Sequence, residues 1–187
     1  MTKDLPSPEL LRKLLRYEPE TGKLFWRERT PDMFDDGLRT ASQRTAAWNT
    51  NYKNKEAFKL TDKDGYFCGT IFSQRYYAHR IAWSIFYGKP LSMQIDHING
   101  NKADNRIANL RACRDYENYW NCAARKNNKS KLKGVSFHKA SGLWRSEISA
   151  KGVKHYLGYY RTAEEAHNAY CEASLKLHGE FSNTGVE

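Results

Sequence analysis

The chain has 187 residues, of which 40% are hydrophobic and 13% aromatic, and it carries a formal net charge of +10 at pH 7. This apolar content suffices for packed cores and excludes a wholly disordered chain. The excess of basic residues favours a polyanionic partner, with nucleic acid ahead of an anionic membrane surface.

Two further classes of protein are disfavoured. No apolar run reaches the roughly 18 residues that a membrane-spanning helix needs, and the first residues lack the apolar core of a secretory signal. The four cysteines, at positions 68, 113, 122 and 171, are too dispersed for a Cys-x-x-Cys metal pair. We therefore expect a cytoplasmic protein with reduced thiols, no structural zinc and no membrane partner.

The N-terminal region begins with a predicted helix and strand. Ser7 is the cap of a helix whose apolar positions are Leu10, Leu11, Leu14 and Leu15. Tyr17–Trp26 predicts a turn that leads into a strand, and we expect this region to pack against the following domain and to add a DNA contact. Residues 30–56 are polar and weakly periodic, which predicts a long loop or a mobile insertion.

The strongest candidate for chemistry follows in the middle of the chain. We predict a strand end, a loop, a second strand and a helix at residues 95–98, 99–106, 107–112 and 115–124. The loop is predicted because it contains Gly100 and several Asn or Asp residues. The first strand presents Asp96 and His97 as direct neighbours.

Asp96 and His97 match what phosphodiester hydrolysis requires: a ligand for a cation that stabilises the phosphate, and a base that activates water. Because neighbouring strand residues point to opposite sides, Asp96 is expected to hold a hard cation while His97 deprotonates water. An oxygen of Asn118, on the predicted helix, would complete the protein ligands for Mg²⁺ or Mn²⁺. Taken singly, each residue is more typical of a turn, a cap or an exposed helix position; taken together, they favour an active site.

The sequence Asp-His-Ile-Asn-Gly-Asn-Lys-Ala-Asp-Asn-Arg at 96–106, followed by Asn109 and Asn118, resembles the HNH endonuclease family. The resemblance is to the phage homing-type branch, in which asparagine replaces the last histidine. It implies metal binding by Asp96 and Asn118, one divalent ion per active site, and the role of general base for His97. Asn109 would brace the loop and orient the histidine, and no small-molecule cofactor is implied.

Basic residues beside this motif are candidates for phosphate contacts. The resemblance extends upstream to His79 and Arg80 and to a Gly-Lys-Pro turn. Arg80 and Arg111 are expected to contact DNA. Two interpretations of His79 stay open, a phosphate contact and a packing histidine beside Trp83 and Phe86, and packing is favoured.

Residues 125–161 are the most basic part of the chain, with ten Lys or Arg residues against one acidic residue, Glu147. A basic surface kept for solubility usually mixes both signs, so we favour a surface that faces phosphate groups. Residues 125–130 lack apolar periodicity and are predicted as a linker that can lie along a DNA backbone.

Residues 131–187 predict a three-stranded antiparallel sheet packed on one helix. Three alternating segments, at 134–138, 143–149 and 153–158, are separated by glycine turns. Their expected core face holds Val135, Phe137, Trp144, Ile148 and Leu157. Thr162 and Glu165 form a capping box for the helix. Its apolar stripe is predicted at Ala163, Ala166, Ala169, Tyr170, Ala173 and Leu177, with His167 and His178 on the exposed side.

This module resembles the APETALA-two/ethylene-response-factor DNA-binding domain, through Lys-Gly-Val at 133–135, Tyr-Leu-Gly-Tyr at 156–159 and Leu-Lys-Leu-His-Gly at 175–179. That family lays the polar face of its sheet in the major groove of DNA. The resemblance implies DNA contacts by Lys133, Ser136, His138, Arg145, Glu147, Ser149, Lys154 and Tyr156. Ser136 and His138 stand where plant members carry arginine, so the plant target sequence is not implied.

Together these features predict an α+β protein. An N-terminal region and HNH nuclease domain would occupy 1–124, with a ββα-metal finger at about 92–123, a linker at 125–130 and the DNA-binding domain at 131–187. We expect a freestanding homing or phage endonuclease that cleaves double-stranded DNA, as a monomer or homodimer, in a bacterial or phage-infected cell. The alternative is a non-catalytic, sequence-specific DNA-binding regulator with a decayed nuclease finger.

Overall fold

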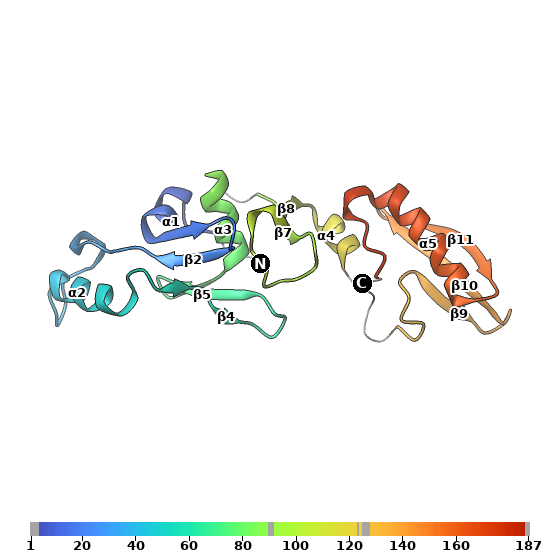
Figure 1. The fold of residues 1–187 in the computed structure, drawn as a ribbon, viewed down its shortest axis with the longest axis horizontal. Coiled ribbons are helices and arrows are strands. Elements are labelled where there is room, and N and C mark those ends of the chain that lie inside the picture. The colour runs from blue at the N-terminus through green and yellow to red at the C-terminus, as the bar shows by residue number, and fades with distance from the viewer. Residues whose placement is uncertain (1–3, 90–91, 123, 125–127, 186–187) are drawn as a thin grey trace. The chain divides into compact units, whose positions relative to one another are not determined.

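A computed structural model describes residues 4–89, 92–122, 124 and 128–185 of the chain (Figure 1). The chain divides into two compact units, Met1–Ala112 and Cys113–Glu187. This division lies upstream of the predicted boundary at residue 124, and residues 125–127 of the predicted linker lie outside the described residues. Among the residues described, none of the helices combines the length and the hydropathy of a transmembrane span.

Helices and strands are mixed along both units. Over the described residues, the α-helices are α1 (Pro8–Leu14), α2 (Ala41–Tyr52), α3 (Ala78–Tyr87), α4 (Asp115–Asn121) and α5 (Ala163–His178). The strands of the N-terminal sheets are β1 (Leu15–Glu18), β2 (Lys23–Trp26), β3 (Glu56–Ala57), β4 (Leu60–Thr61), β5 (Phe67–Ile71) and β6 (Gln74–Tyr77). The later strands are β7 (Gln94–His97), β8 (Leu110–Cys113), β9 (Val135–His138), β10 (Leu143–Ala150) and β11 (Val153–Tyr160). They form sheets in the orders β1-β2-β3, β4-β5-β6, β7-β8 and β11-β10-β9.

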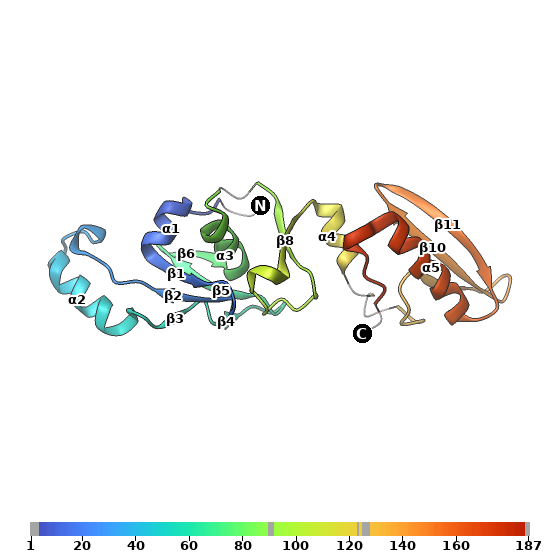
Figure 2. The same ribbon diagram turned by 45° about the horizontal axis from the view of Figure 1, so that its top comes forward.

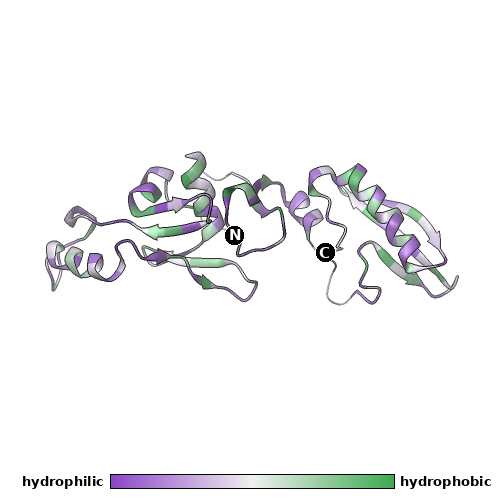
Figure 3. Cartoon of the chain, viewed as in Figure 1, coloured by the Kyte–Doolittle hydropathy of each residue, from purple (hydrophilic) through white to green (hydrophobic). Residues whose placement is uncertain are grey.

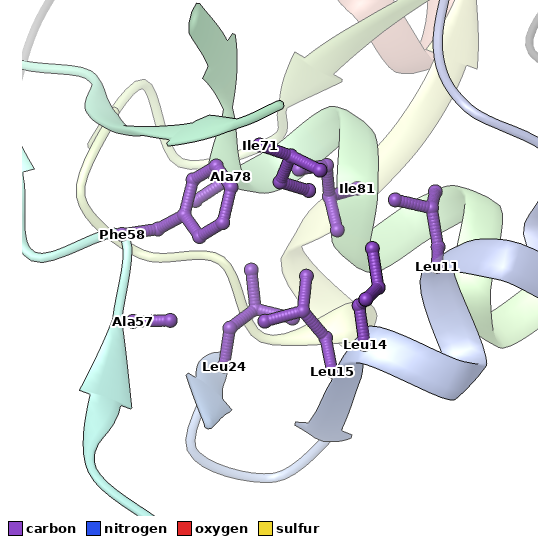
Figure 4. Packing of buried hydrophobic residues seen from close by; sticks show 9 residues of the cluster. All are labelled: Leu11, Leu14, Leu15, Leu24, Ala57, Phe58, Ile71, Ala78 and Ile81. Carbon is purple, nitrogen blue, oxygen red and sulfur yellow. The ribbon is translucent and has the colours of Figure 1, made fainter. Parts of the chain in front are cut away.

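The core of the N-terminal unit gathers side chains from α1, α3 and the first two sheets (Figure 4). The predicted helix is present as α1, with Ser7 Oγ accepting a hydrogen bond from Leu10 N at 3.3 Å. Leu15, predicted as helical, instead begins β1. Leu11, Ile71 and Ile81 are at most 1% exposed, so the leucines of α1 are anchored by β5 and α3.

Residues 30–56 contain a helix, α2, so the predicted long loop was wrong. Thr40 caps its first turn in a capping box. Figure 3 shows α2 as largely hydrophilic and α3 as largely hydrophobic. Tertiary contacts hold α2 instead: the Trp48 ring lies edge-on to Trp26 with centroids 5.7 Å apart, and the Arg29 guanidinium lies 4.0 Å from the Trp48 centroid. Such anchors stabilise a helix without a periodic apolar stripe.

The predicted order of strand, strand and helix in the candidate catalytic region is present as β7, β8 and α4. β8 begins later than predicted because Ile107–Asn109 forms a 3₁₀ turn, and α4 ends at Asn121 rather than at residue 124. The sheet of β4, β5 and β6, which precedes α3, was not predicted.

The C-terminal unit contains the three predicted strands, with α5 along one face of the sheet (Figures 1 and 2). Thr162 caps α5 as predicted, its Oγ1 accepting a hydrogen bond from Glu165 N at 3.1 Å. The buried side chains between sheet and helix include Val135, Ile148, Ala150, Ala166 and Tyr170. Gly134 has φ +76°, and a Cβ atom there would lie 1.9 Å from the Tyr170 ring, so only glycine fits.

The core face of this sheet is less buried than predicted, since Phe137 is exposed and both Trp144 and Leu157 are half-buried. Phe137 is 51% exposed and meets the edge of Trp144 with ring centroids 5.1 Å apart. Leu157 is half-buried beside a register shift between Ser146 and Glu147 of β10. The irregular register interrupts simple alternation, which is why a period of two placed Leu157 in the core.

The two histidines predicted on the surface of α5 are buried. His167 and His178 are each 6% exposed. His167 Nδ1 bonds the carbonyl oxygen of Lys133 at 3.0 Å, and His178 Nε2 bonds the carbonyl oxygen of Ser149 at 3.0 Å. The buried stripe of α5 therefore includes polar residues with partners, whereas Leu177, predicted in the stripe, is 37% exposed.

α4 belongs to the C-terminal unit, which explains the position of the boundary. Trp120 is 7% exposed and stacks on His178, with ring centroids 4.3 Å apart. Lys133 Nζ donates to the carbonyl oxygens of Trp120, Cys122 and Asn183 at 2.6, 2.6 and 2.9 Å. Burial lowers the pKa of Lys133 to about 8. These carbonyls take all three ammonium donors, so none is left for the predicted DNA contact of Lys133.

We expect Trp120→Ala to lower the free energy of unfolding of the C-terminal unit by about 3–5 kcal/mol, the usual cost of removing a large aromatic ring from a core. Tyr119→Ala is the matched control on the same helix, because Tyr119 is 58% exposed. Its effect should stay within about 0.5 kcal/mol. Urea unfolding of the full chain, followed by circular dichroism, measures both. Equal effects would contradict the assignment of α4 to this core.

Candidate active site

Asp96 and His97 are consecutive residues of β7, and both are buried, at 6% and 3% exposure. β7 is hydrogen-bonded to β8. Ile95 packs with Ala82 of α3 and Leu110 of β8 in a small apolar cluster. This cluster fixes the strand, so the carboxylate and the imidazole project from a rigid element.

The Asp96 carboxylate forms a buried ion pair with Arg111 of β8. Asp96 Oδ2 accepts a hydrogen bond from Arg111 Nε at 3.0 Å and lies 2.9 Å from Nη2. The two side chains are 7% and 11% exposed. Removing either partner would leave an uncompensated buried charge. Of the two predicted DNA contacts beside the motif, Arg111 is thus largely removed from solvent, and Arg80 is half-buried on α3.

One ring nitrogen of His97 contacts the loop that follows β7. Its Nε2 lies 2.9 Å from Asn105 Oδ1. Because an amide oxygen only accepts hydrogen bonds, this contact assigns the proton to Nε2 and the basic lone pair of the neutral ring to Nδ1. Burial lowers the pKa of His97, which favours the neutral ring. No role was predicted for Asn105 from the sequence. Its position in the motif, eight residues after His97, was the available signal.

The hairpin of β1 and β2 supports the backbone at Asn105. Tyr17 Oη donates a hydrogen bond to Asn105 O at 2.7 Å. Gly22, in the hairpin turn, has φ +74°, and a Cβ atom there would lie 2.5 Å from the Asn105 carbonyl carbon. The hairpin therefore approaches this loop as closely as backbone atoms allow. This contact fixes the position of Asn105, which in turn bonds His97.

Asn109 braces the loop between β7 and β8. Its Oδ1 accepts a hydrogen bond from Asn99 N at 3.0 Å, and its Nδ2 donates to Asp104 O at 2.8 Å. The Asp104 carboxylate also accepts from Arg106 Nε at 2.8 Å, and this partner lowers the pKa of Asp104 to about 2. Both ends of the loop are thus tied to one buried asparagine.

His79 of α3 is a buried neighbour of His97. Its ring centroid lies 5.0 Å from that of His97 and 5.3 Å from that of Tyr66. Its ring neighbours thus include Tyr66 and His97, which were not predicted, and its burial agrees with the favoured interpretation as a packing histidine. Over the described ranges, His79 Nδ1 has no hydrogen-bond partner, and burial lowers the pKa of His79 to about 3.

The predicted metal site depends on Asp96 and Asn118. Asn118 lies on α4, in the other unit, so its ligation of an ion shared with Asp96 stays a prediction. In the part of the chain that the structure describes, no group of three or more His, Cys, Asp or Glu side chains is arranged to hold a metal ion. Asp96 suits Mg²⁺, which often takes one or two protein oxygens with water, but Arg111 already neutralises this carboxylate.

The other predicted DNA-contacting residues lie on the three C-terminal strands: Ser136, His138, Arg145, Glu147, Ser149, Lys154 and Tyr156. The antiparallel register places them opposite one another on one face of the sheet. Glu147 lies 3.4 Å from Arg145 Nε and 3.0 Å from Lys154 Nζ, so one carboxylate offsets two cations. Tyr159 is paired with Arg145 on this face and is 41% exposed. It was not among the predicted DNA contacts.

Two known proteins share partial likeness with this chain. The ethylene-responsive transcription factor ERN3 of Medicago truncatula is 46% identical over 59 residues, which are 30% of this chain and 24% of that protein. A solved structure of DNA binding and cleavage by the HNH homing endonuclease I-HmuI aligns with a TM-score of 0.40 and 17% identity, over 96% of this chain and 93% of that chain.

Two further comparisons identify the family. The HNH endonuclease family model matches residues 76–119, which include β7, β8 and α3. Protein 3.8 of Escherichia phage T7 is 34% identical over 105 residues, which are 56% of this chain and 86% of that protein. The chain therefore belongs to the HNH endonuclease family.

Proposed function

We propose that this HNH protein is a metal-dependent endonuclease that hydrolyses phosphodiester bonds of double-stranded DNA. The observation that carries the proposal is the buried His97, whose Nε2 bonds Asn105 at 2.9 Å. Nδ1 is then the atom that takes a proton from the attacking water. A positioned general base of this kind contributes about 10²–10⁴-fold to a reaction rate.

Asp96 and Asn118 are the proposed metal ligands. A bound Mg²⁺ or Mn²⁺ would stabilise the charge that develops on the scissile phosphate. Asp96 supports this assignment because it is the carboxylate next to the base, and hard cations prefer carboxylate oxygens. Arg111 occupies Asp96 Oδ2 and therefore competes with a cation for that oxygen.

The C-terminal unit is proposed to select the DNA site as an APETALA-two/ethylene-response-factor type domain. The 59-residue likeness to ERN3, the basic residues of 125–161 and the shared face of the three strands support this assignment. Basic residues on such a face gain affinity by releasing counterions from phosphates. The likeness to a phage T7 protein supports a freestanding phage or homing enzyme. A monomer would nick one strand, and a homodimer would cut both.

A non-catalytic DNA-binding regulator is the second candidate. The buried Asp96–Arg111 ion pair favours it, because Arg111 neutralises the carboxylate where an active enzyme would bind a cation. The two candidates differ in one property, the cutting of DNA. The retention of a buried, oriented His97 favours the enzyme, since a regulator has no use for a base in this position.

Replacing His97 with Ala should slow plasmid nicking in Mg²⁺ or Mn²⁺ by about 10²–10⁴-fold, because the proposed base is lost. DNA affinity should stay nearly unchanged. His155→Ala is the control, since His155 is paired with the buried Ile148 on the face of β11 opposite the proposed DNA contacts. If the native chain cuts no DNA in either metal, the endonuclease proposal fails and the regulator is favoured.

Asn105→Ala should lower the turnover rate at least about tenfold without weakening DNA binding, because His97 would lose the partner that fixes its base nitrogen. Asn101→Ala, at an exposed position of the same loop, is the matched control. Long-range ¹H–¹⁵N NMR spectra of the histidine rings measure the tautomer directly. An unchanged His97 tautomer in Asn105→Ala would contradict the positioning role.

Asp96→Asn should abolish cleavage and weaken Mn²⁺ binding while keeping DNA affinity, because asparagine retains an acceptor for Arg111 but loses the charge. Isothermal titration calorimetry measures the Mn²⁺ affinity. Asp64→Asn, an exposed position of the same unit, is the control. Native Mn²⁺ affinity in Asp96→Asn would remove Asp96 from the metal site, and loss of folding would assign the ion pair a structural role.

A further inference from the structure

A second candidate site lies in the N-terminal unit, outside the family-matched residues 76–119. It is a cavity of about 500 Å³ whose walls include Lys13, Arg16, Trp26, Arg27, Met33 and Lys53. This volume lies within the roughly 300–1,000 Å³ of typical small-ligand sites. None of these residues belongs to the candidate active site.

The cavity carries an excess of positive charge. Four of its lining side chains are cationic, and one, Glu28, is anionic. Lys53 Nζ pairs with Glu28 Oε2 at 2.7 Å, and Arg16 pairs with a glutamate of its own strand. Over the described residues, Lys13 and Arg27 make no ion pair. Their two charges are therefore available to an anion that enters the cavity.

Trp26 gives the cavity a flat and rigid wall. Its ring is fixed by Trp48 and Phe58, at centroid distances of 5.7 and 6.0 Å. In a DNA duplex each charged phosphate adjoins the apolar face of a sugar, and cations beside an apolar wall match this combination. An acidic peptide offers the charge without the adjoining sugar, so the wall favours a nucleotide.

We propose that this cavity binds a phosphate of the DNA backbone, with the adjoining sugar against Trp26 and Met33. The inference rests on the proposed function for the choice of DNA as partner. It adds a contact separate from the candidate active site and from the C-terminal sheet. Since the cationic groups meet phosphate, the contact positions the duplex without reading its sequence.

The test is the salt dependence of binding of the full chain to a short DNA duplex, measured by fluorescence anisotropy in EDTA so that no cutting occurs. Lys13→Gln with Arg27→Gln removes the unpaired charges of the cavity. Lys63→Gln with Arg39→Gln removes one lysine and one arginine from exposed positions elsewhere in the same unit. The slope of log affinity against log salt should fall by about 1.8 in the cavity variant, about 0.9 for each lost contact, and stay unchanged in the control.

Equal slopes in the two double variants would overturn the proposal. A second result would also overturn the proposal. If the cavity variant alone loses binding to poly-L-glutamate and keeps binding to the duplex, the cavity binds an acidic peptide. Lys13→Gln and Arg27→Gln are also measured separately, and each should lower the salt slope by half as much as the double variant. Misfolding of the double variant then does not decide the result. Because binding is measured without cutting, a chain that binds through the cavity but never cuts refutes only the endonuclease proposal.

Discussion

The hydrogen bond between His97 and Asn105 is the interaction on which the candidate site depends. Either nitrogen of an imidazole can act as a base, and the partner of the other nitrogen decides which one does. In this buried position the opposite tautomer would set two acceptors against each other, at a cost of about 1–3 kcal/mol. Tyr17 and Gly22 hold the backbone of Asn105, and Asn109 holds the loop before it. The frame of the site therefore begins in the N-terminal hairpin, upstream of the family-matched residues.

The ion pair of Asp96 and Arg111 is a second constraint, and it acts in two directions. A carboxylate that is 7% exposed would be costly to keep ionised alone, so Arg111 allows the charged form to persist beside His97. The same guanidinium occupies Oδ2, which a cation would also seek. A metal that binds Asp96 must therefore share the carboxylate with Arg111 or displace it. The stability that the ion pair provides and the affinity for a cation therefore depend on the same side chain in opposite ways.

The sequence could predict the elements whose signals are local, such as the cap at Ser7, the glycine turns of the C-terminal sheet and the strand that carries the Asp-His pair. α2 was missed because Arg29 and Trp48, which anchor it, interact across 19 positions and leave no periodic trace. Asn105 stands in the 96–106 motif, but its role was missed because a hydrogen bond across a loop leaves no periodic signal. The burial of Lys133 depends on carbonyl groups 13 and 50 positions away. Long-range polar contacts, rather than apolar periodicity, account for these errors.

α4 ties the proposed metal ligand to the C-terminal unit. The helix carries Asn118, while Trp120 and the carbonyl groups at its end are bound by His178 and Lys133. A simple tether between a nuclease and a recognition domain would act only through effective concentration. Here the helix that carries the ligand depends for its own packing on the unit proposed to recognise DNA. A substitution that destabilises the C-terminal sheet is therefore expected to shift α4 and Asn118 through the contacts of Trp120. The position of His97 should not change, because β7 and Asn105 lie in the N-terminal unit.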